Sequence, residues 1–176
     1  MHYSLFLYPT AAQGRIDPHK IQRLLESLGF VAETEPSGAF AAGDRLMEHI
    51  NFLGCSPSLQ SGQVDCTVRL HLFDSPVGLG GHSIDTLRYP SCKHPIDNPA
   101  DLIQSGPDSA WRCTHCANQG KVSDINWRKS AAFAECFIEV SAIFPKEAVP
   151  TPAFLEALKP LCDCDWNWFY SASTET

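Results

Sequence analysis

The segment Val64-Asp-Cys-Thr-Val-Arg-Leu-His-Leu-Phe73 alternates apolar and polar residues. Successive side chains of a β-strand point to opposite faces of a sheet, so this alternation gives the strand one apolar and one polar face. Arg69 and His71 belong to the polar face. The sequence therefore predicts a half-buried β-strand over residues 64–73.

A second alternating segment runs from Glu135 to Phe144, and we expect it to be the other central strand. Its inward positions are Cys136, Ile138, Val140, Ala142 and Phe144. Between the two strands, residues 75–130 form an excursion with little hydrophobic periodicity. A structureless connection of this length is improbable in a compact domain. The excursion therefore requires something that orders it.

Periodicity and capping residues predict the remaining elements. Asp17-Pro18 supplies an N-cap and a proline at the first helical position, and Gly29 closes that helix. Thr151-Pro152 begins another helix in the same way. The other predicted elements are strands over residues 3–8, 30–35 and 165–170 and a helix over residues 44–53.

The order strand, helix, strand, strand, helix, strand resembles the ferredoxin-like, or split βαβ, arrangement. We therefore predict an α+β fold in a single domain over residues 1–176. The resemblance implies an antiparallel sheet of four or five strands with helices packed on one face. The excursion over residues 75–130 would then leave the sheet between its two central strands.

Cysteine spacing gives the clearest chemical signal in the chain. Cys113-Thr-His-Cys116 has C-x-x-C spacing, which lets two thiols on one tight turn point at a common ion. Cys92 and His94 lie upstream and are the nearest candidates for a second pair. The sequence predicts a structural zinc site formed by Cys92, His94, Cys113 and Cys116.

Residues 87–118 resemble a degenerate zinc ribbon, in which two knuckles of the form aromatic-x-Cys-Pro-x-Cys-Gly hold one zinc ion. The segment Trp111-Arg-Cys-Thr-His-Cys-Ala117 matches the second knuckle, with Ala117 in place of glycine. The first knuckle matches only in part, because Tyr89 stands where its first cysteine is expected. The resemblance implies three thiolate ligands and a fourth of another kind.

Three histidines are candidates for the fourth ligand, in the order His94, His82 and His115. Four protein ligands would make a closed structural site, whereas three would leave a position for water and make the site catalytic. There are two other interpretations: the metal site has decayed and no longer binds an ion, or the cysteines have a redox function. Redox use is disfavoured because residues 117–121 predict a turn, whereas a redox C-x-x-C usually opens a helix.

Charge and composition argue against several partners. The chain has 176 residues, of which 44% are hydrophobic, and it carries 13 basic against 20 acidic side chains. An acidic chain argues against nucleic acid as a partner, and residues 87–118 form no basic surface. No segment approaches the roughly 20 apolar residues that span a membrane. The first residues lack a signal-peptide pattern, so we expect a cytoplasmic protein with reduced thiols.

Several other residues carry weaker signals. Cys55 follows a predicted helix end and would need a histidine base to act as a nucleophile. His82 follows a glycine-rich turn, where a histidine usually has no catalytic role. Cys162 and Cys164 are either ligands of a second metal or ordinary residues at a helix end. No P-loop or dinucleotide-binding fingerprint occurs in the sequence.

The last predicted strand carries Trp166, Trp168 and Tyr170 on one face. Such an aromatic stripe is usually part of the core, and otherwise serves dimerisation or ligand stacking. The residues expected to line the open face of the sheet are Arg69, His71, Glu139 and Phe137. A homodimer through that open face is one expectation for the assembly of this chain.

These observations favour a small zinc-stabilised protein that acts, without catalysis, as an interaction or assembly module for a protein partner. The alternative is a hydrolase or transferase with a site between the sheet and the excursion. That site would use Cys55, His71, His82 or an open zinc position. A perturbed pKa at one of these histidines, together with a sizeable pocket that contains it, would favour the enzyme, and a filled four-ligand site without such a pocket would favour the module.

Overall fold

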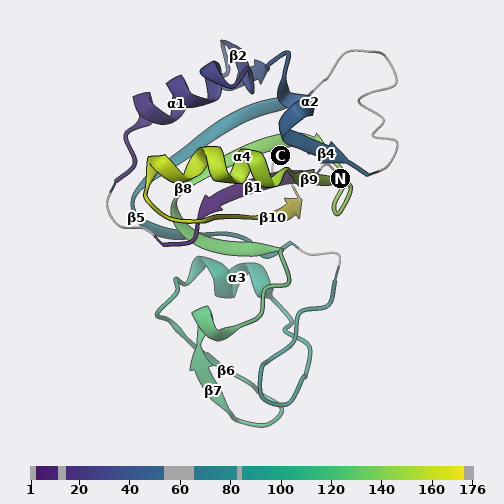
Figure 1. The fold of residues 1–176 in the computed structure, drawn as a ribbon. Helices are drawn as coiled ribbons and strands as arrows, with labels where there is room; N and C mark the ends of the chain where they lie inside the picture. Colours follow the sequence, from purple (N-terminus) through teal and green to yellow (C-terminus); the bar gives the residue numbers. More distant parts are fainter. Residues whose placement is uncertain (1–2, 12–14, 54–65, 83–84, 173–176) are drawn as a thin grey trace.

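The computed structural model describes residues 3–11, 15–53, 66–82 and 85–172 of the chain (Figure 1). Strands and short helices are interspersed along the chain, and a long segment with little regular structure separates β5 from β8. In chain order the elements are β1 (Tyr3–Pro9), α1 (Pro18–Ser27), β2 (Val31–Thr34), β3 (Phe40–Ala42), α2 (Leu46–His49), β4 (Ile50–Phe52), β5 (Thr67–Gly80), α3 (Pro99–Gln104), β6 (Ala110–Arg112), β7 (Gln119–Lys121), η2 (Val122–Asp124), β8 (Ala131–Ile143), β9 (Ala148–Pro150), α4 (Pro152–Leu158), η3 (Lys159–Leu161) and β10 (Trp166–Ala172).

The predicted helices at 17–28 and after Thr151 form where their capping residues place them. The Asp17 carboxylate accepts a hydrogen bond from the His19 amide at 2.9 Å, which satisfies one free N–H of the first turn of α1. Thr151 caps α4 in the same way through the Phe154 amide at 3.2 Å. Gly29 ends α1 with a φ of +65°, a left-handed conformation that favours glycine.

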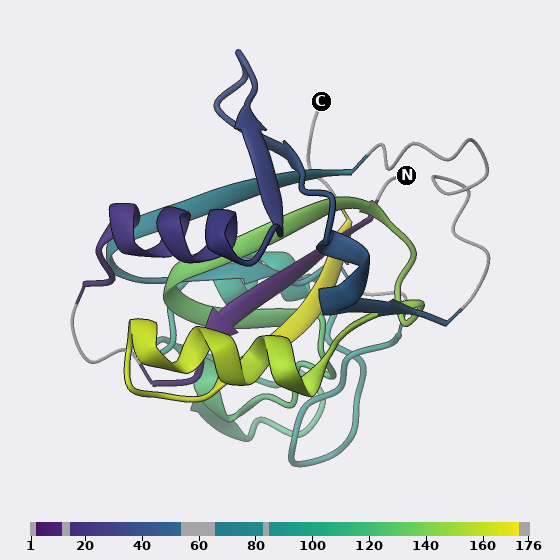
Figure 2. The same cartoon turned by 45° about the horizontal axis from the view of Figure 1, so that its top comes forward.

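The main sheet has six strands rather than the four or five expected, in the order β10-β1-β8-β5-β3-β2. Each neighbouring pair is antiparallel. The strand of this sheet that was not predicted is β3, which pairs with β2 in a short hairpin at one edge, and this hairpin projects beyond α1 in Figure 2. Two further pairs, β4–β9 and β6–β7, lie outside this sheet. The fold is a mixed α and β arrangement around an antiparallel sheet.

The predicted helix over residues 44–53 is only partly present. The α2 helix covers Leu46–His49, and the chain then continues as β4, in which Ile50 pairs with Pro150 and Phe52 with Ala148. Hydrogen bonds to β9 therefore replace the last helical turn. A partner distant in sequence overrides the local helical pattern here.

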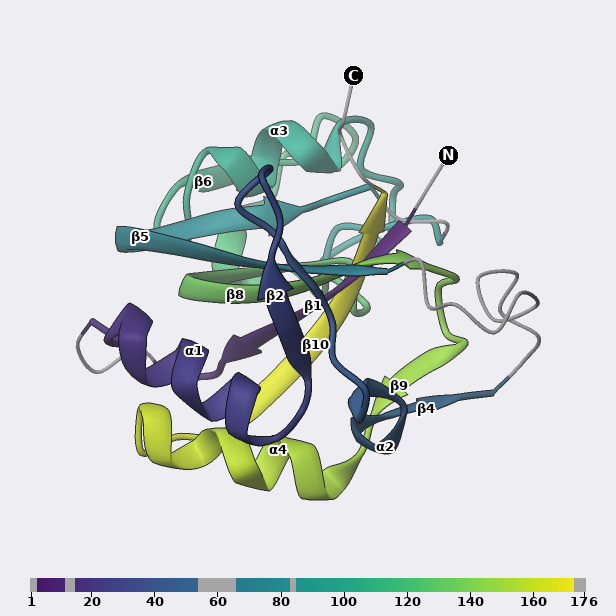
Figure 3. The same cartoon turned by 90° about the horizontal axis from the view of Figure 1, so that it is seen from above.

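Both faces of the sheet are covered, at least in part. The helices α1 and α4 lie on one face, as Figure 3 shows, and α3 lies on the other, in contact with β5 and β8. The prediction of helices on one face therefore holds for α1 and α4 but not for α3. The first face holds the main core, which includes Trp166 and Tyr170, so the aromatic stripe is confirmed as a core face.

The two central strands are longer than predicted. Their pairing continues past an irregularity between Leu72 and Val77 to the pair Gly80 and Ala131. The excursion therefore leaves the sheet at Gly81 and returns at Ser130, rather than spanning residues 75–130, and it forms the lower lobe in Figure 1. Gly78 is required in β5 because a Cβ atom there would lie 2.2 Å from the Ile103 carbonyl oxygen of α3.

Candidate metal centre

Three cysteine thiols meet in the excursion. Cys92 comes from the turn between Arg88 and Pro95, whereas Cys113 and Cys116 come from the turn that joins β6 to β7. The Sγ atoms of the three cysteines lie within 4.8 Å of one another, and those of Cys92 and Cys113 are 3.5 Å apart. C-x-x-C spacing and one upstream cysteine thus predicted a group of side chains that the fold brings together.

The two turns that supply these thiols have the same backbone hydrogen bonds. In the second turn, the Cys113 amide donates to the Asn118 carbonyl at 2.9 Å, and the Ala117 amide donates back to the Cys113 carbonyl at 2.9 Å. In the first turn, the Tyr89 amide donates to His94 at 3.0 Å and the Lys93 amide to Tyr89 at 3.2 Å. Each donor and acceptor of one turn thus has a counterpart in the other.

A left-handed residue recurs at the same position in both turns. Lys93 and Ala117 each follow a cysteine of the cluster, and their φ angles are +62° and +59°. Residues with a Cβ rarely adopt this left-handed conformation. This is the position at which a zinc knuckle carries glycine, so Lys93 and Ala117 adopt the glycine conformation without being glycine.

This repeat places Tyr89 in the position of Cys113. The Tyr89 ring packs on the Trp111 ring, with centroids 5.2 Å apart. Burial raises the pKa of Tyr89, and the nearby Cys113, Asp97 and Cys92 raise it further. Tyr89 therefore occupies the position in the first turn that Cys113 occupies in the second, and it lies close to the thiols.

The histidines proposed as the fourth ligand lie elsewhere. His94 corresponds to Asn118 in the repeat, and its imidazole stacks on that of His115 with a centroid distance of 4.7 Å. Neither ring belongs to the group of ligand atoms within 4.8 Å, which consists of the three thiols. His82 lines pockets next to the main sheet. The structure thus brings together three of the four predicted ligands, and His94 stands apart.

The three thiols differ in their electrostatic surroundings. The Ser91 hydroxyl, at 3.4 Å, and the backbone of Asn118 lower the pKa of Cys116 to about 7, against the effect of burial. A backbone hydrogen bond from His94 lowers the pKa of Cys92, but burial and the neighbouring thiols outweigh it and raise the pKa overall. Cys116 is therefore the thiol of this pair that more readily becomes the thiolate, which is the metal-binding form.

The cluster is attached to a small core of its own. Cys113 is fully buried in this core, and Cys92 and Cys116 pack against it. The other buried members are Leu87, Ile96, Ile103, Trp111, Val122, Ile125, Trp127 and Ala131. Three converging thiols at the edge of an apolar cluster suit a soft or borderline metal ion such as zinc.

The remaining cysteines have other surroundings. Cys66 and Cys136 are buried, and burial raises the pKa of Cys136 to about 12. Cys162 and Cys164 are joined in a disulfide, which differs from the expectation of reduced thiols and from a second metal site. Cys55 lies outside the described residues.

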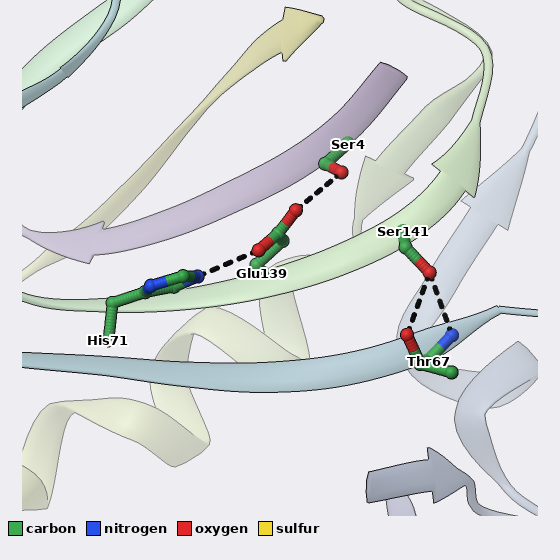
Figure 4. A network of polar contacts seen from close by, with 5 residues as sticks. All are labelled: Ser4, Thr67, His71, Glu139 and Ser141. Atoms are coloured by element: carbon green, nitrogen blue, oxygen red, sulfur yellow. Dashed lines mark hydrogen bonds and ion pairs between the residues drawn. The ribbon is translucent and has the colours of Figure 1, made fainter. Parts of the chain in front are cut away.

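A second polar group lies on the sheet face opposite α1 and α4. The Glu139 carboxylate accepts a hydrogen bond from Ser4 Oγ at 2.7 Å, and its other oxygen lies 2.7 Å from His71 Nε2 (Figure 4). Burial alone would raise the pKa of Glu139. The hydrogen bonds from His71 and Ser4, with the charges of His71 and Arg69, outweigh burial and hold that pKa below its usual range.

This group lines a pocket of about 260 Å³ between the sheet and the excursion. His71, His82 and Glu139 line it together with Gly80 at the end of β5 and Gln104 of α3. The sequence indicated His71 and His82 as candidates but gave Glu139 no specific role and missed Ser4. Arg69 and Glu139 are paired across β5 and β8, and that register is not visible in either segment alone.

Comparisons of this chain with protein-family models, curated proteins and solved structures found no match. Among the described residues, no helix is both long enough and apolar enough to span a membrane. The functional argument therefore rests on the geometry of the chain itself.

Proposed function

We propose that residues 87–118 form a degenerate zinc ribbon and that the protein is a zinc-stabilised interaction or assembly module rather than an enzyme. Cys92, Cys113 and Cys116 would hold the zinc ion, which would order the excursion between β5 and β8. The observation that carries this proposal is the convergence of three thiols on two turns with the same backbone hydrogen bonds and a left-handed residue at the same position.

The spacing of the thiols supports zinc. Thiolates about 2.3 Å from one tetrahedral zinc ion would lie roughly 3.8 Å apart. The 3.5 Å between Cys92 and Cys113, with all three Sγ atoms within 4.8 Å, is close to that value. His94 would complete the site only if its ring left the stack with His115.

The strand order supports a ferredoxin-like frame around the ribbon. The four long strands have the order β10-β1-β8-β5, and all three contacts between them are antiparallel. With α1 after β1 and α4 before β10, this is the order of a split βαβ sheet. The long β5–β8 connection would thus be an insertion that presents the ribbon away from the sheet.

A protein is the partner that we propose for this module, because the acidic chain offers little for nucleic acid. The sheet face proposed for a homodimer is less open than its residue pattern implies. Phe137 and Phe169 on that face are both fully buried within the protein. The exposed surface of the excursion is therefore the better candidate for the contact, and a cytoplasmic location stays a prediction.

Metal analysis tests this proposal. Untagged protein purified without added metal or chelator should contain about one zinc ion per chain by plasma mass spectrometry. Protein without metal, with the three thiols accessible to a thiol reagent, would contradict it.

Restoring the missing cysteine should tighten metal binding. In the Tyr89→Cys variant, a thiol would replace the phenol at the position that repeats Cys113. A fourth thiolate should raise zinc affinity by at least about tenfold, or 1.4 kcal/mol, despite the lost packing on Trp111. Competition with a chromophoric chelator measures the affinity. Thr114→Cys adds a thiol to a turn of the site at a position that does not correspond to a ligand, and it should leave the affinity unchanged.

A second candidate function, hydrolysis or group transfer, has one observation in its favour. The pocket beside His71 holds a histidine fixed by a buried carboxylate, which is how proteins orient a general base. Hydrolysis of simple esters or phosphoesters that disappears in His71→Ala would support this function. Equal rates in the variant and the wild type would reject it.

The Glu139 network should also stabilise the fold in a pH-dependent way. Glu139→Gln leaves His71 and Ser4 without their anionic partner and should lower the free energy of unfolding by about 1–3 kcal/mol at neutral pH. The folded-state pKa of Glu139 is depressed, so this stabilisation is present above the ordinary pKa of 4.5 and is lost as the pH falls below it.

Urea unfolding of both proteins between neutral pH and pH values below 4.5 measures this effect. The two stabilities should converge in acid. Glu33→Gln, an exposed position in β2, should show almost no difference at any pH. A constant gap between wild type and Glu139→Gln would show that lost packing, not charge, is responsible.

A further inference from the structure

Three cationic residues line a pocket of about 130 Å³ where the excursion returns to the sheet. Arg128 and Lys129 precede β8, and Lys146 lies in the turn between β8 and β9. Asp85 and Tyr170 contribute to the same pocket. Three cations against one carboxylate make a local positive charge on a chain whose formal net charge is −7.

All three cationic residues have left-handed backbone conformations. The φ angles are +49° at Arg128, +56° at Lys129 and +68° at Lys146. The Ser130 amide donates to the Trp127 carbonyl at 2.9 Å, so Arg128 and Lys129 are the two central residues of a tight turn. Turns with two positive φ angles favour Asn-Gly or similar pairs, because side chains with a Cβ are strained there.

A similar turn holds Lys146, with the Glu147 amide donating to the Phe144 carbonyl at 3.2 Å. Asparagine or glycine would adopt the left-handed conformation at all three positions at a lower conformational cost. Strained backbone is concentrated at functional sites, where a particular side chain is required. The coincidence of strain with positive charge at three pocket positions therefore indicates a role for the charges.

Two of the three cationic side chains already have partners within the protein. Lys129 Nζ lies 3.1 Å from the centre of the Trp168 ring and donates to Asn167 Oδ1 at 3.0 Å. Lys146 Nζ is 3.1 Å from an Asp85 carboxylate oxygen. The Arg128 guanidinium makes no hydrogen bond or ion pair with any residue of the described ranges, and it is exposed at the pocket.

We propose that this pocket binds the phosphate group of a small molecule. The Lys129 ammonium is held against Trp168 and Asn167, which are not among the residues that line the pocket. Arg128 and Lys146 are therefore the two cations that would contact the phosphate. Guanidinium groups bind phosphate oxygens in a bidentate manner, and lysine ammonium groups add point charges. The pocket is large enough for the phosphate head group, and the remainder of the ligand would extend through the opening. This site uses none of the metal-centre cysteines.

Titration with inorganic phosphate tests the proposal on the intact protein. Backbone amide NMR signals of residues 128–130 and 146 should shift in a saturable way at constant ionic strength, with a millimolar or lower dissociation constant. Sodium chloride should give no saturable shift. Sodium acetate tests whether the pocket binds a carboxylate instead. Saturable shifts with acetate but not with phosphate would overturn the phosphate assignment. Equal shifts with all three salts would overturn it as well.

A double variant separates ligand binding from folding. Arg128→Asn with Lys146→Asn removes two cations and places a residue that tolerates the left-handed conformation at both positions. The phosphate dissociation constant should rise at least about tenfold, while the Tm stays equal or rises. Lys20→Gln with Arg23→Gln makes the same change in net charge on exposed α1 positions and should bind phosphate as the wild type does.

Two results from the double variant would overturn the assignment. One is phosphate binding equal to that of the wild type. The other is a Tm that falls together with binding, because it would mean that the two side chains serve the packing of the turns and not a ligand.

Discussion

Replacing Cys113 and Cys116 by serine should unfold the excursion and leave the main sheet folded. In hydrogen exchange, amides of β6, β7 and the neighbouring turns should lose protection, whereas those of β1, β5 and β8 should keep it. A chelator should produce the same pattern in the wild-type protein. Metal content should fall to background in both cases.

The physical reason is the difference between two cores. The sheet has a large core against α1 and α4, which does not include the cysteine cluster. The excursion has a small core to which Cys113 belongs. Structural zinc contributes about 10–16 kcal/mol in isolated finger peptides, which is far more than such a small core supplies. Loss of the ion should therefore unfold the excursion alone.

Cys136→Ser is the matched control, because Cys136 is a buried thiol of β8 outside the cluster. It should destabilise the sheet through an unsatisfied buried hydroxyl and leave the metal content unchanged. The double serine variant would contradict the metal centre if it kept both its metal and the protection of the excursion.

Local sequence pattern was sufficient where an element depends on its own residues. Asp17 and Gly29 mark the ends of α1, and residues 135–143 of the predicted strand lie in β8. Phe144 was expected to point inward but lies beyond the end of β8 and is 45% exposed. Pattern failed where a distant segment decides the structure. Residues 77–80 lack strand periodicity, yet they extend β5 because residues 131–134 pair with them. The predicted helix at 44–53 ends early because β9 pairs with its last residues.

In the candidate metal site, too, local sequence spacing predicted some features and the folded backbone decides the others. The spacing of Cys113 and Cys116 is local, and with Cys92 it predicted a group of thiols that the structure brings together. His94 follows the left-handed Lys93, and its ring stacks on that of His115 rather than joining the three thiols. A lysine at that position gives no signal in the sequence, whereas a glycine would have.

Truncating Phe137 should be among the most destabilising single changes in the sheet. Phe137 is fully buried, and its ring contacts those of Tyr8, Phe73 and Phe169 at centroid distances of 6.3, 6.4 and 6.1 Å. Phe137→Ala should lower the free energy of unfolding by about 3–5 kcal/mol, because it removes a large apolar side chain and leaves a cavity. Urea unfolding measures this loss.

Phe144→Ala is the control, because Phe144 is 45% exposed and lies just beyond the end of the same strand. The same truncation there should lower the free energy of unfolding by roughly 1 kcal/mol or less. The comparison also decides between a core and a dimer surface for this face of the sheet. If Phe137 were a dimer contact, its truncation would change the oligomeric state and the concentration dependence of unfolding. Because the ring is already enclosed within one chain, the loss should be the same at every protein concentration.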